Sequence, residues 1–239
     1  RVMSNLHNAD TRNGLRWREN IVIDGVECTP RMVRYMKRKA DIIAMLKAQI
    51  ANGTFRIKHL KSFETADGPK IRTVQAPSVI ERVGSNAIME IVEKHLAPIL
   101  IENTAASIEG RGPHGLYHKM QEARRNNPKL IYYYQSDYKG YYDHILHDRL
   151  IEIIKRYIAD PVLLPILIDF VKALHPNDNV GISKGLRSSQ FFGNLYHNDI
   201  DHIMEEVCGK DHYFRFCDDI YILGEEKKTL WKCRDRLHE

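Results

Sequence analysis

The spacing of hydrophobic residues predicts helices and strands in separate blocks along the chain. Apolar residues recur at helical intervals in five segments, which are 31–50, 79–96, 144–158, 161–174 and 188–208. Runs of aromatic and β-branched residues are typical of half-buried strands, and they occur in 55–77 around the turn ADGPK, before Asp137, and on both sides of Asp218 and Asp219. A glycine-bracketed loop, GRGPHGLYHKM, opens a further helix, and Asp143 stands where it can cap the helix of 144–158.

The order of these blocks in the second half of the chain indicates an α+β fold. A strand is followed by helices and then by a hairpin, which is the outline of a split βαβ sheet packed on helices. In that topology the strand ending at Asp137 lies beside the hairpin carrying Asp218, although 81 residues separate them. We therefore expect the two carboxylates to meet at one edge of the sheet.

The stretch YFRFCDDIYIL sets Asp218 and Asp219 at a hairpin tip that has no glycine. Adjacent like charges in an apolar setting raise each other's pKa or need a compensating cation. One interpretation is an exposed loop tip with solvated acids, and the other is a metal site completed by Asp137. Hard oxygen ligands select Mg²⁺, with Mn²⁺ as a substitute. A pair of such ions supports phosphoryl transfer, so the second interpretation predicts a nucleotidyltransferase.

The charge of the chain is unevenly distributed. The net charge is +5, but residues 1–134 carry 22 Lys and Arg against 13 Asp and Glu, whereas 135–239 carry 14 against 18. A basic first part suits a polyanion, although ordinary surface variation also produces differences of this size. Arg34, Lys37 and Arg38 form either a solvated helix face or a set of phosphate contacts. Arg111, in the glycine loop, contacts phosphate or is incidental to a turn.

Composition argues against a membrane protein and against a disulfide framework. No apolar run approaches the roughly 20 residues of a membrane span, and the four cysteines lack CxxC spacing. We therefore expect a cytoplasmic protein with reduced thiols and no membrane partner. The start at Arg1 shows neither a signal peptide nor an initiator Met, which we interpret as a fragment or a trimmed chain.

Three segments, SDYKGYYD, GISKGLRSSQFFGNLYHNDID and FRFCDDIYIL, resemble in order and spacing the central palm motifs of reverse transcriptases. Upstream, GPKIRTVQAPSVIERV and GRGPHGLYHKM look like the fingers motifs of bacterial members. The resemblance implies a right-hand polymerase fold, with fingers and part of the palm helices in 31–130 and the palm in 131–239. Residues 1–30 form an unassigned N-terminal extension, and the thumb expected after the palm is absent.

The resemblance also implies roles for particular residues. The metal ligands would be Asp137, Asp218 and the main-chain carbonyl of Tyr138, with Asp219 tuning the site of two Mg²⁺ ions. Contacts to the incoming dNTP would come from Lys70, Arg72, Tyr142, Lys184, Gly185 and Gln190. Within this set Lys70 and Arg72 would hold the triphosphate, Tyr142 would lie below the sugar, and Gly185 would lie under the nascent base pair. Nucleic acid would be contacted by Arg34, Lys37, Arg38, Arg82 and Arg111.

The subfamily is expected to be that of diversity-generating retroelements, because Gly185, Ser189 and Gln190 are similar to its Gly-x-x-x-Ser-Gln pattern. Lys184 and Cys217 depart from the usual residues, so abortive-infection and group II intron enzymes stay as alternatives. The implied partners are an RNA template, a DNA primer, dNTPs and a basic accessory protein. Two rival hypotheses are a catalytically silent nucleic-acid-binding protein with the same fold, and an RNA-directed RNA polymerase, which the bulky Tyr142 disfavours.

Overall fold

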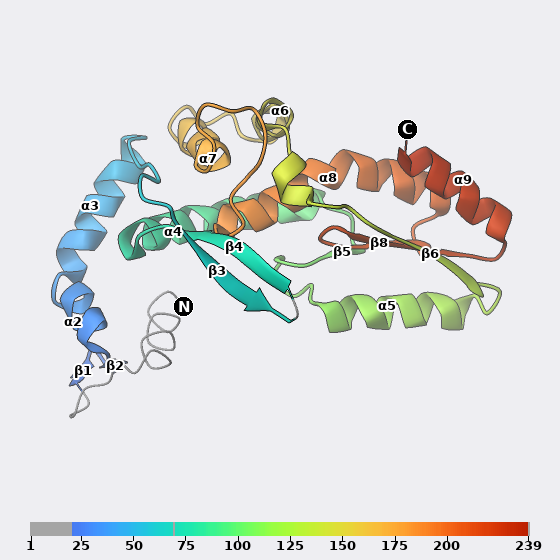
Figure 1. Ribbon diagram of the computed structural model, residues 1–239, viewed down its shortest axis with the longest axis horizontal. Coiled ribbons are helices and arrows are strands. Elements are labelled where there is room, and N and C mark those ends of the chain that lie inside the picture. Colours follow the sequence, from blue (N-terminus) through green and yellow to red (C-terminus); the bar gives the residue numbers. More distant parts are fainter. Residues whose placement is uncertain (1–20, 69, 239) are drawn as a thin grey trace.

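The computed structural model describes residues 21–68 and 70–238 (Figure 1). Its helices and strands, in chain order, are β1 Ile21–Ile23, β2 Val26–Cys28, α2 Pro30–Lys37, α3 Lys39–Ala51, β3 Lys61–Asp67, β4 Lys70–Ala76, α4 Val79–Leu96, η1 Ala97–Ile99, β5 Thr104–Ala105, α5 Pro113–Asn126, β6 Tyr132–Asp137, η2 Tyr141–His144, α6 His147–Tyr157, α7 Leu163–Lys172, α8 Arg187–Cys208, β7 Tyr213–Phe216, β8 Asp219–Gly224 and α9 Lys227–His238. Of the predicted N-terminal extension, residues 1–20 lie outside the described residues, and the β1–β2 hairpin occupies part of the rest.

A four-stranded sheet in the order β5-β7-β8-β6 forms the centre of the second half of the chain. β7 and β8 form an antiparallel hairpin, and β6 pairs antiparallel with β8. β6 and β7 therefore run in the same direction with β8 between them, which confirms the predicted split βαβ arrangement and the α+β class. β5 adds a parallel strand beside β7, so residues 104–105, from the range 31–130, join the sheet formed by the second half of the chain.

Helices cover both faces of this sheet, with α8 and α9 on one side and α5 on the other (Figure 1). The cluster on the α8 and α9 side comprises Ile101, Met204, Cys208, Tyr213, Ile220, Ile222, Leu230 and Cys233. The cluster on the α5 side comprises Ala105, Leu116, Ala123, Leu130, Phe214 and Leu223. Alternate residues along β7 and β8 thus point to opposite helical layers, as the two-residue period of a strand requires.

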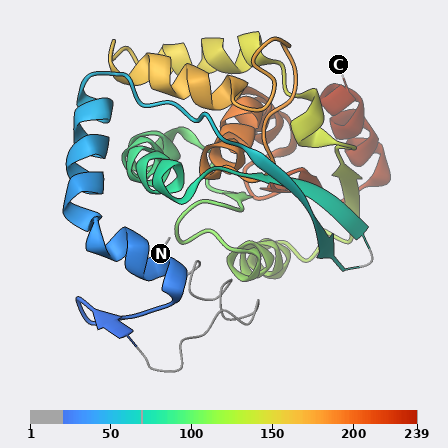
Figure 2. The ribbon, with the colours of Figure 1, turned by 60° about the vertical axis from the view of Figure 1, so that its left-hand side comes forward.

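The largest hydrophobic core lies where α4, α6, α7 and α8 pack together. Figure 2 shows α4 and α8 almost end-on, with α6 and α7 above them and the β3–β4 hairpin passing in front. Ser78 is the N-cap residue of α4 and forms a capping box with Glu81, and the helix covers the range predicted from the sequence. Ile91, one of the apolar residues of the segment 79–96, is 70% exposed.

Two local expectations were wrong. The single helix expected over 31–50 is two helices, because the backbone at Arg38 leaves the helical region and ends α2. Asp143 does not cap α6, whose N-cap position is Leu146 without a side-chain hydrogen bond. Asp143 lies in η2 and pairs with Lys184 instead.

Among the helices that the structure describes, none combines the length and the apolar character needed to cross a bilayer.

Candidate active site

Three aspartates meet at one end of the four-stranded sheet. In the β6–β8 register Asp137 lies directly across from Asp219, and Asp218 precedes Asp219 in the hairpin loop. The main-chain N–H of Tyr138 donates to the carbonyl of Asp218 at 3.4 Å, which joins the end of β6 to the loop. The fold therefore brings together the aspartates whose meeting the sequence topology predicts.

Cys217 and Asp218 form a two-residue hairpin loop without glycine, since Phe216 pairs with Asp219 across the hairpin. Cys217 has a φ of 57°, in the left-handed region that costs a residue with a Cβ about 1–2 kcal/mol. Positive φ suits such a short loop because it matches the twist of the strands. The Arg215 guanidinium donates to the Cys217 carbonyl at 2.6 Å. A buried side chain thus helps to hold the loop in its strained conformation.

The electrostatics of the three aspartates favour a bound cation. Burial and the charges of Asp218 and Asp137 raise the pKa of Asp219 above its ordinary value. A metal ion would relieve this repulsion. Within the described part of the chain, no group of three or more His, Cys, Asp or Glu side chains is arranged to hold a metal ion. Mg²⁺ needs fewer, usually one or two carboxylates with water and substrate phosphate, so the oxygen donors at this sheet end fit it.

Tyr142 lies beside the aspartate hairpin, whereas its neighbour Tyr141 belongs to the core. The Tyr142 hydroxyl is 3.3 Å from the Cys217 sulfur, and burial raises the pKa of Tyr142. Tyr141 is 8% exposed and donates its hydroxyl to the Gly193 carbonyl at 2.7 Å. A Cβ added at Gly193 would lie 3.0 Å from the Tyr142 ring, so this glycine lets α8 approach both tyrosines.

The end of β4 is joined to the turn that precedes α8. The buried Gln75 side chain accepts hydrogen bonds from the Lys184 N–H at 3.1 Å and from the Ser183 hydroxyl at 3.4 Å. A Cβ at Gly185 would collide with the main chain of Gln75. The family resemblance placed Gly185 under the nascent base pair. In this structure, atoms of β4 leave no room for a side chain at Gly185.

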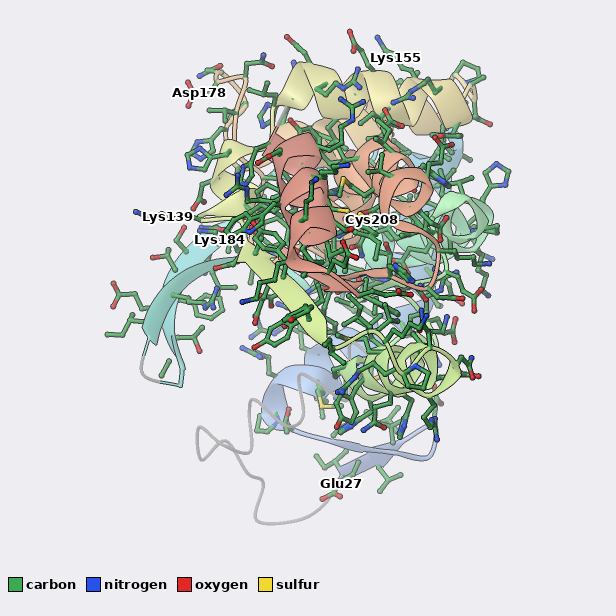
Figure 3. All side chains as sticks on the ribbon, turned by 90° about the vertical axis from the view of Figure 1, so that its right-hand side faces the viewer. Glu27, Lys139, Lys155, Asp178, Lys184 and Cys208 are labelled. Carbon is green, nitrogen blue, oxygen red and sulfur yellow. The ribbon has the colours of Figure 1, made fainter. Side chains whose placement is uncertain are left out.

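Lys184 is fixed by an ion pair. Its Nζ lies 2.7 Å from the Asp143 carboxylate, so the lysine is tethered to η2. Figure 3 labels Lys184 and Lys139 on the side of the molecule from which the β3–β4 hairpin projects. A cation is therefore held on the same side as the hairpin that carries the candidate triphosphate ligands.

The remaining candidate dNTP contacts lie on β4 and α8. Lys70 is the first residue of β4, and its side chain falls outside the part of the chain that the structure describes. Arg72 is exposed on the same strand and pairs in register with Thr65. Gln190 is exposed in the first turn of α8. The link between Gln75 and the turn before α8 brings these two elements together at the palm end of β4.

The predicted nucleic-acid contacts do not form one group. Arg34, Lys37 and Arg38 are exposed on α2 and at its end, and Figure 1 shows α2 near one end of the long axis and α5, which follows Arg111, in the other half. Arg82 is half-buried on α4. Arg111 donates to the Ile101 carbonyl at 2.7 Å, so its guanidinium has a structural contact near β5.

A buried polar network beneath the aspartates was missed by the sequence analysis. Asp201 of α8 and Arg215 of β7 are each 0% exposed and form an ion pair. A signal was present for Arg215, which interrupts the apolar strand YFRF. Asp201 lies among other polar residues in HNDIDH, where no pattern sets it apart.

Comparison with known proteins identifies the domain. The model of the reverse transcriptase (RNA-dependent DNA polymerase) family matches residues 41–239. Among solved structures, an apo telomerase from Candida tropicalis truncated from its C-terminal domain shares the fold with a TM-score of 0.57 at 11% identity. The match covers 85% of this chain and 52% of that one, so this chain spans about half the length of its structural relative. A comparison with curated proteins gave no match. With a family match over most of its length, the chain belongs to the reverse transcriptases, a family of RNA-directed DNA polymerases.

Proposed function

We propose that this chain extends a DNA primer on an RNA template with dNTPs. The observation that carries the proposal is the position of Asp137 opposite Asp219 and beside Asp218, at a sheet end bordered by Tyr142. We assign residues 31–130 to the fingers and 131–239 to the palm, with β5 as a strand that the first range contributes to the palm sheet.

We assign the metal ligands to Asp137, Asp218 and the main-chain carbonyl of Tyr138, which would hold two Mg²⁺ ions or Mn²⁺ in their place. When bound, such a pair of ions stabilises the attacking and leaving oxygens of phosphoryl transfer. Asp219 adds negative charge without being a main ligand, which strengthens the attraction for the cations. The protein thus supplies a fixed set of oxygen donors on two paired strands.

The dNTP contacts that we propose come from two sides. On β4, Lys70 and Arg72 would bind the triphosphate, Arg by bidentate contacts and Lys as a point charge. On the palm side, Gly185 and Gln190 would lie near the base. Lys184 would contribute a cation whose position is set by its pair with Asp143. Its main chain is joined to β4 through the side chain of Gln75.

For nucleic acid, we propose that phosphates are bound by the exposed basic residues of the fingers. Arg34, Lys37 and Arg38 are the main candidates, since all three are exposed. Arg82 and Arg111 are weaker candidates, because Arg82 is half-buried and Arg111 is bonded to a main-chain carbonyl. Binding that rests on such contacts weakens steeply with salt.

We also propose a place among the diversity-generating retroelement enzymes, supported by Gly185, Ser189 and Gln190 in the pattern Gly-x-x-x-Ser-Gln. A basic accessory protein would then be a further partner. The neighbouring genes test this assignment. A template repeat with a variable repeat supports diversification, whereas an intron RNA or a cluster of defence genes would contradict it.

Primer extension tests the activity itself, with an RNA template, a DNA primer, dNTPs and Mg²⁺. We expect extension by the parent protein, and its loss in Asp137→Asn and Asp218→Asn with nucleic-acid binding retained within a few fold. The matched control is Asp211→Asn, which alters an exposed aspartate just before β7 and should leave extension intact. Binding without extension by the parent would instead indicate the catalytically silent alternative.

A further inference from the structure

The buried carboxylate of Asp201 collects hydrogen bonds from several elements of the palm. The Tyr213 hydroxyl donates to it at 2.8 Å, and the Thr104 hydroxyl donates at 3.0 Å. The His197 Nδ1 lies 3.1 Å away and must donate, because an ionised carboxylate only accepts. Arg215 completes the set through Nε and Nη2, and its charge keeps the pKa of Asp201 well below the ordinary range in spite of burial.

Arg215 uses its whole guanidinium within this network. Nε and Nη2 bond to Asp201, and Nη2 also donates to the main-chain carbonyl of Asn194 at 3.3 Å. Nη1 donates to the Asn194 side-chain oxygen at 2.9 Å and to the Cys217 carbonyl at 2.6 Å. A lysine has a single nitrogen and cannot reach this set of acceptors. Arg215 therefore joins α8 to the hairpin loop.

Two branches of the network end beside the candidate metal ligands. One runs from Asp201 through Arg215 to the carbonyl of Cys217, the residue before Asp218. The other runs from Asp201 through His197 to the hydroxyl of Tyr138, the residue after Asp137, with His197 Nε2 at 3.0 Å from that hydroxyl.

We propose that Asp201, Arg215 and His197 are positioning residues that fix the spacing of the two aspartate-bearing strand ends, an inference that rests on the metal-binding role proposed above. α8 acts as the rigid base of this arrangement, and each branch holds one side of the site. Cys217 needs such a hold, because its left-handed conformation is unfavourable without the Arg215 contact.

Stability alone gives a weaker account of this network. A buried ion pair often contributes no more to stability than well-packed apolar residues of the same volume, since both charges lose their hydration. The surrounding clusters of the sheet are apolar, so an apolar pair would fit the composition of this core. What an apolar pair could not supply is the directed hydrogen bond to the loop carbonyl.

Two tyrosines in the network allow a matched test. Tyr138→Phe and Tyr213→Phe each remove one hydroxyl. The hydroxyl of Tyr138, the residue next to Asp137, contacts His197, whereas that of Tyr213 contacts Asp201. The first readout is Mn²⁺ binding by the protein without nucleic acid, measured from the electron paramagnetic resonance signal of free Mn²⁺. The second is the Mg²⁺ concentration that gives half-maximal primer extension. Melting temperatures report the structural cost of each change.

Loss of residues that orient metal ligands typically costs 10- to 100-fold in metal affinity or activity. We expect Tyr138→Phe to weaken Mn²⁺ binding by about tenfold and to raise the Mg²⁺ requirement to match, near the low end of that range. Tyr213→Phe should lower the melting temperature at least as much and leave metal binding at the parent value. Arg215→Lys keeps the charge beside Asp201 and loses the loop contact, so it should weaken Mn²⁺ binding more strongly.

The inference is overturned if Tyr138→Phe and folded Arg215→Lys bind Mn²⁺ as the parent does, or if Tyr213→Phe weakens binding equally. If Arg215→Lys does not fold, the comparison of the two tyrosines decides. A parent protein that binds Mn²⁺ but extends no primer would contradict the proposed polymerase activity and leave the binding comparison to decide the positioning role. A parent that binds no Mn²⁺ overturns both.

Discussion

The hydroxyl of Tyr142 lies 3.3 Å from the sulfur of Cys217, so the ring stands next to the loop that carries Asp218. Under the proposed function this is the place of the incoming sugar. A packed ring there would occupy the volume of a ribose 2′-OH, and making room would strain the protein by roughly 1–3 kcal/mol. The structure thus gives a specific reason to examine sugar selection at Tyr142.

Tyr142→Ala is expected to raise ribonucleotide incorporation by about one to two orders of magnitude, since each 1.4 kcal/mol corresponds to a tenfold change in rate. Use of dNTPs should stay largely intact. The control is Tyr141→Phe. Tyr141 is a core residue, and replacing it with alanine would leave a cavity. Single-nucleotide incorporation with rNTPs and dNTPs measures both. The prediction fails if a folded, dNTP-active Tyr142→Ala protein excludes rNTPs as strongly as the parent.

Lys184 and Asp143 should affect fidelity in opposite directions. Asp143 tethers the lysine at 2.7 Å, so Asp143→Asn would release a mobile cation near the pocket and raise misincorporation by a few fold. Lys184→Gln would replace the cation with a neutral hydrogen-bonding group and lower misincorporation. Because the effect of Asp143→Asn acts through the lysine, the double variant should behave like Lys184→Gln. Sequencing of extension products measures all three, and additive effects would contradict this coupling.

Gly185→Ala is expected to disturb the junction between β4 and the palm. Its Cβ would meet the main chain of Gln75, which cannot rotate away as a side chain could. Overpacking of this kind costs typically 1–3 kcal/mol, or several degrees in melting temperature for a chain of this size, and the displaced strand should also raise KM for dNTPs. Gly115→Ala is the control, since nothing lies within 4 Å of its added Cβ. Equal melting temperatures for the two variants would refute the expected collision.

Glu81 should give the fold a characteristic acid sensitivity. Burial alone would raise the pKa of Glu81, but hydrogen bonds from Lys58 N–H and from Ser78 lower it below its ordinary value of 4.5. A lowered pKa means that the ionised group stabilises the fold above about pH 4.5, and that this contribution is lost as pH falls through the lower folded-state pKa. Calorimetry of Glu81→Gln should therefore show a lower melting temperature at pH 7 and a difference from the parent that shrinks toward pH 3.

The control for that experiment is Glu90→Gln on the same helix. Glu90 forms an exposed pair with Lys94, and exposed pairs contribute little to stability. A Glu81→Gln deficit that stays constant from pH 7 to pH 3 would show that the lost hydrogen bonds, and not the charge, are responsible.

The strand topology was predictable because its signals are local. The run before Asp137 and the two runs around Asp218 each carry the composition of strands, and the helical spacing between them leaves few ways to connect them. The meeting of the aspartates follows from that order. The break at Arg38 was not predictable, because neither Pro nor Gly marks the end of α2.

The buried side of α8 was predicted only in part. Ile200, Ile203 and Val207 are apolar residues of the predicted helix 188–208, yet they are 37%, 40% and 47% exposed. The helix turns Asp201 inward instead, where Arg215 on β7 pairs with it. The spacing of residues within one helix cannot show which residue of another element will pair with it. For the same reason the sequence did not reveal the pair that Lys184 forms with Asp143.

The strand order has a consequence for how the protein acquires its site during synthesis. β6 pairs with β8 and with no earlier strand of the four-stranded sheet, so Tyr132–Asp137 has no strand partner in that sheet until 219–224 has been made. Pairings between such distant segments form late, because the intervening loop must close first. A nascent chain that has already buried α4 and α6 would therefore hold Asp137 on an unpaired strand. Under the proposed function, the aspartates of the metal site therefore come together in one late step, when the β7–β8 hairpin pairs with β6.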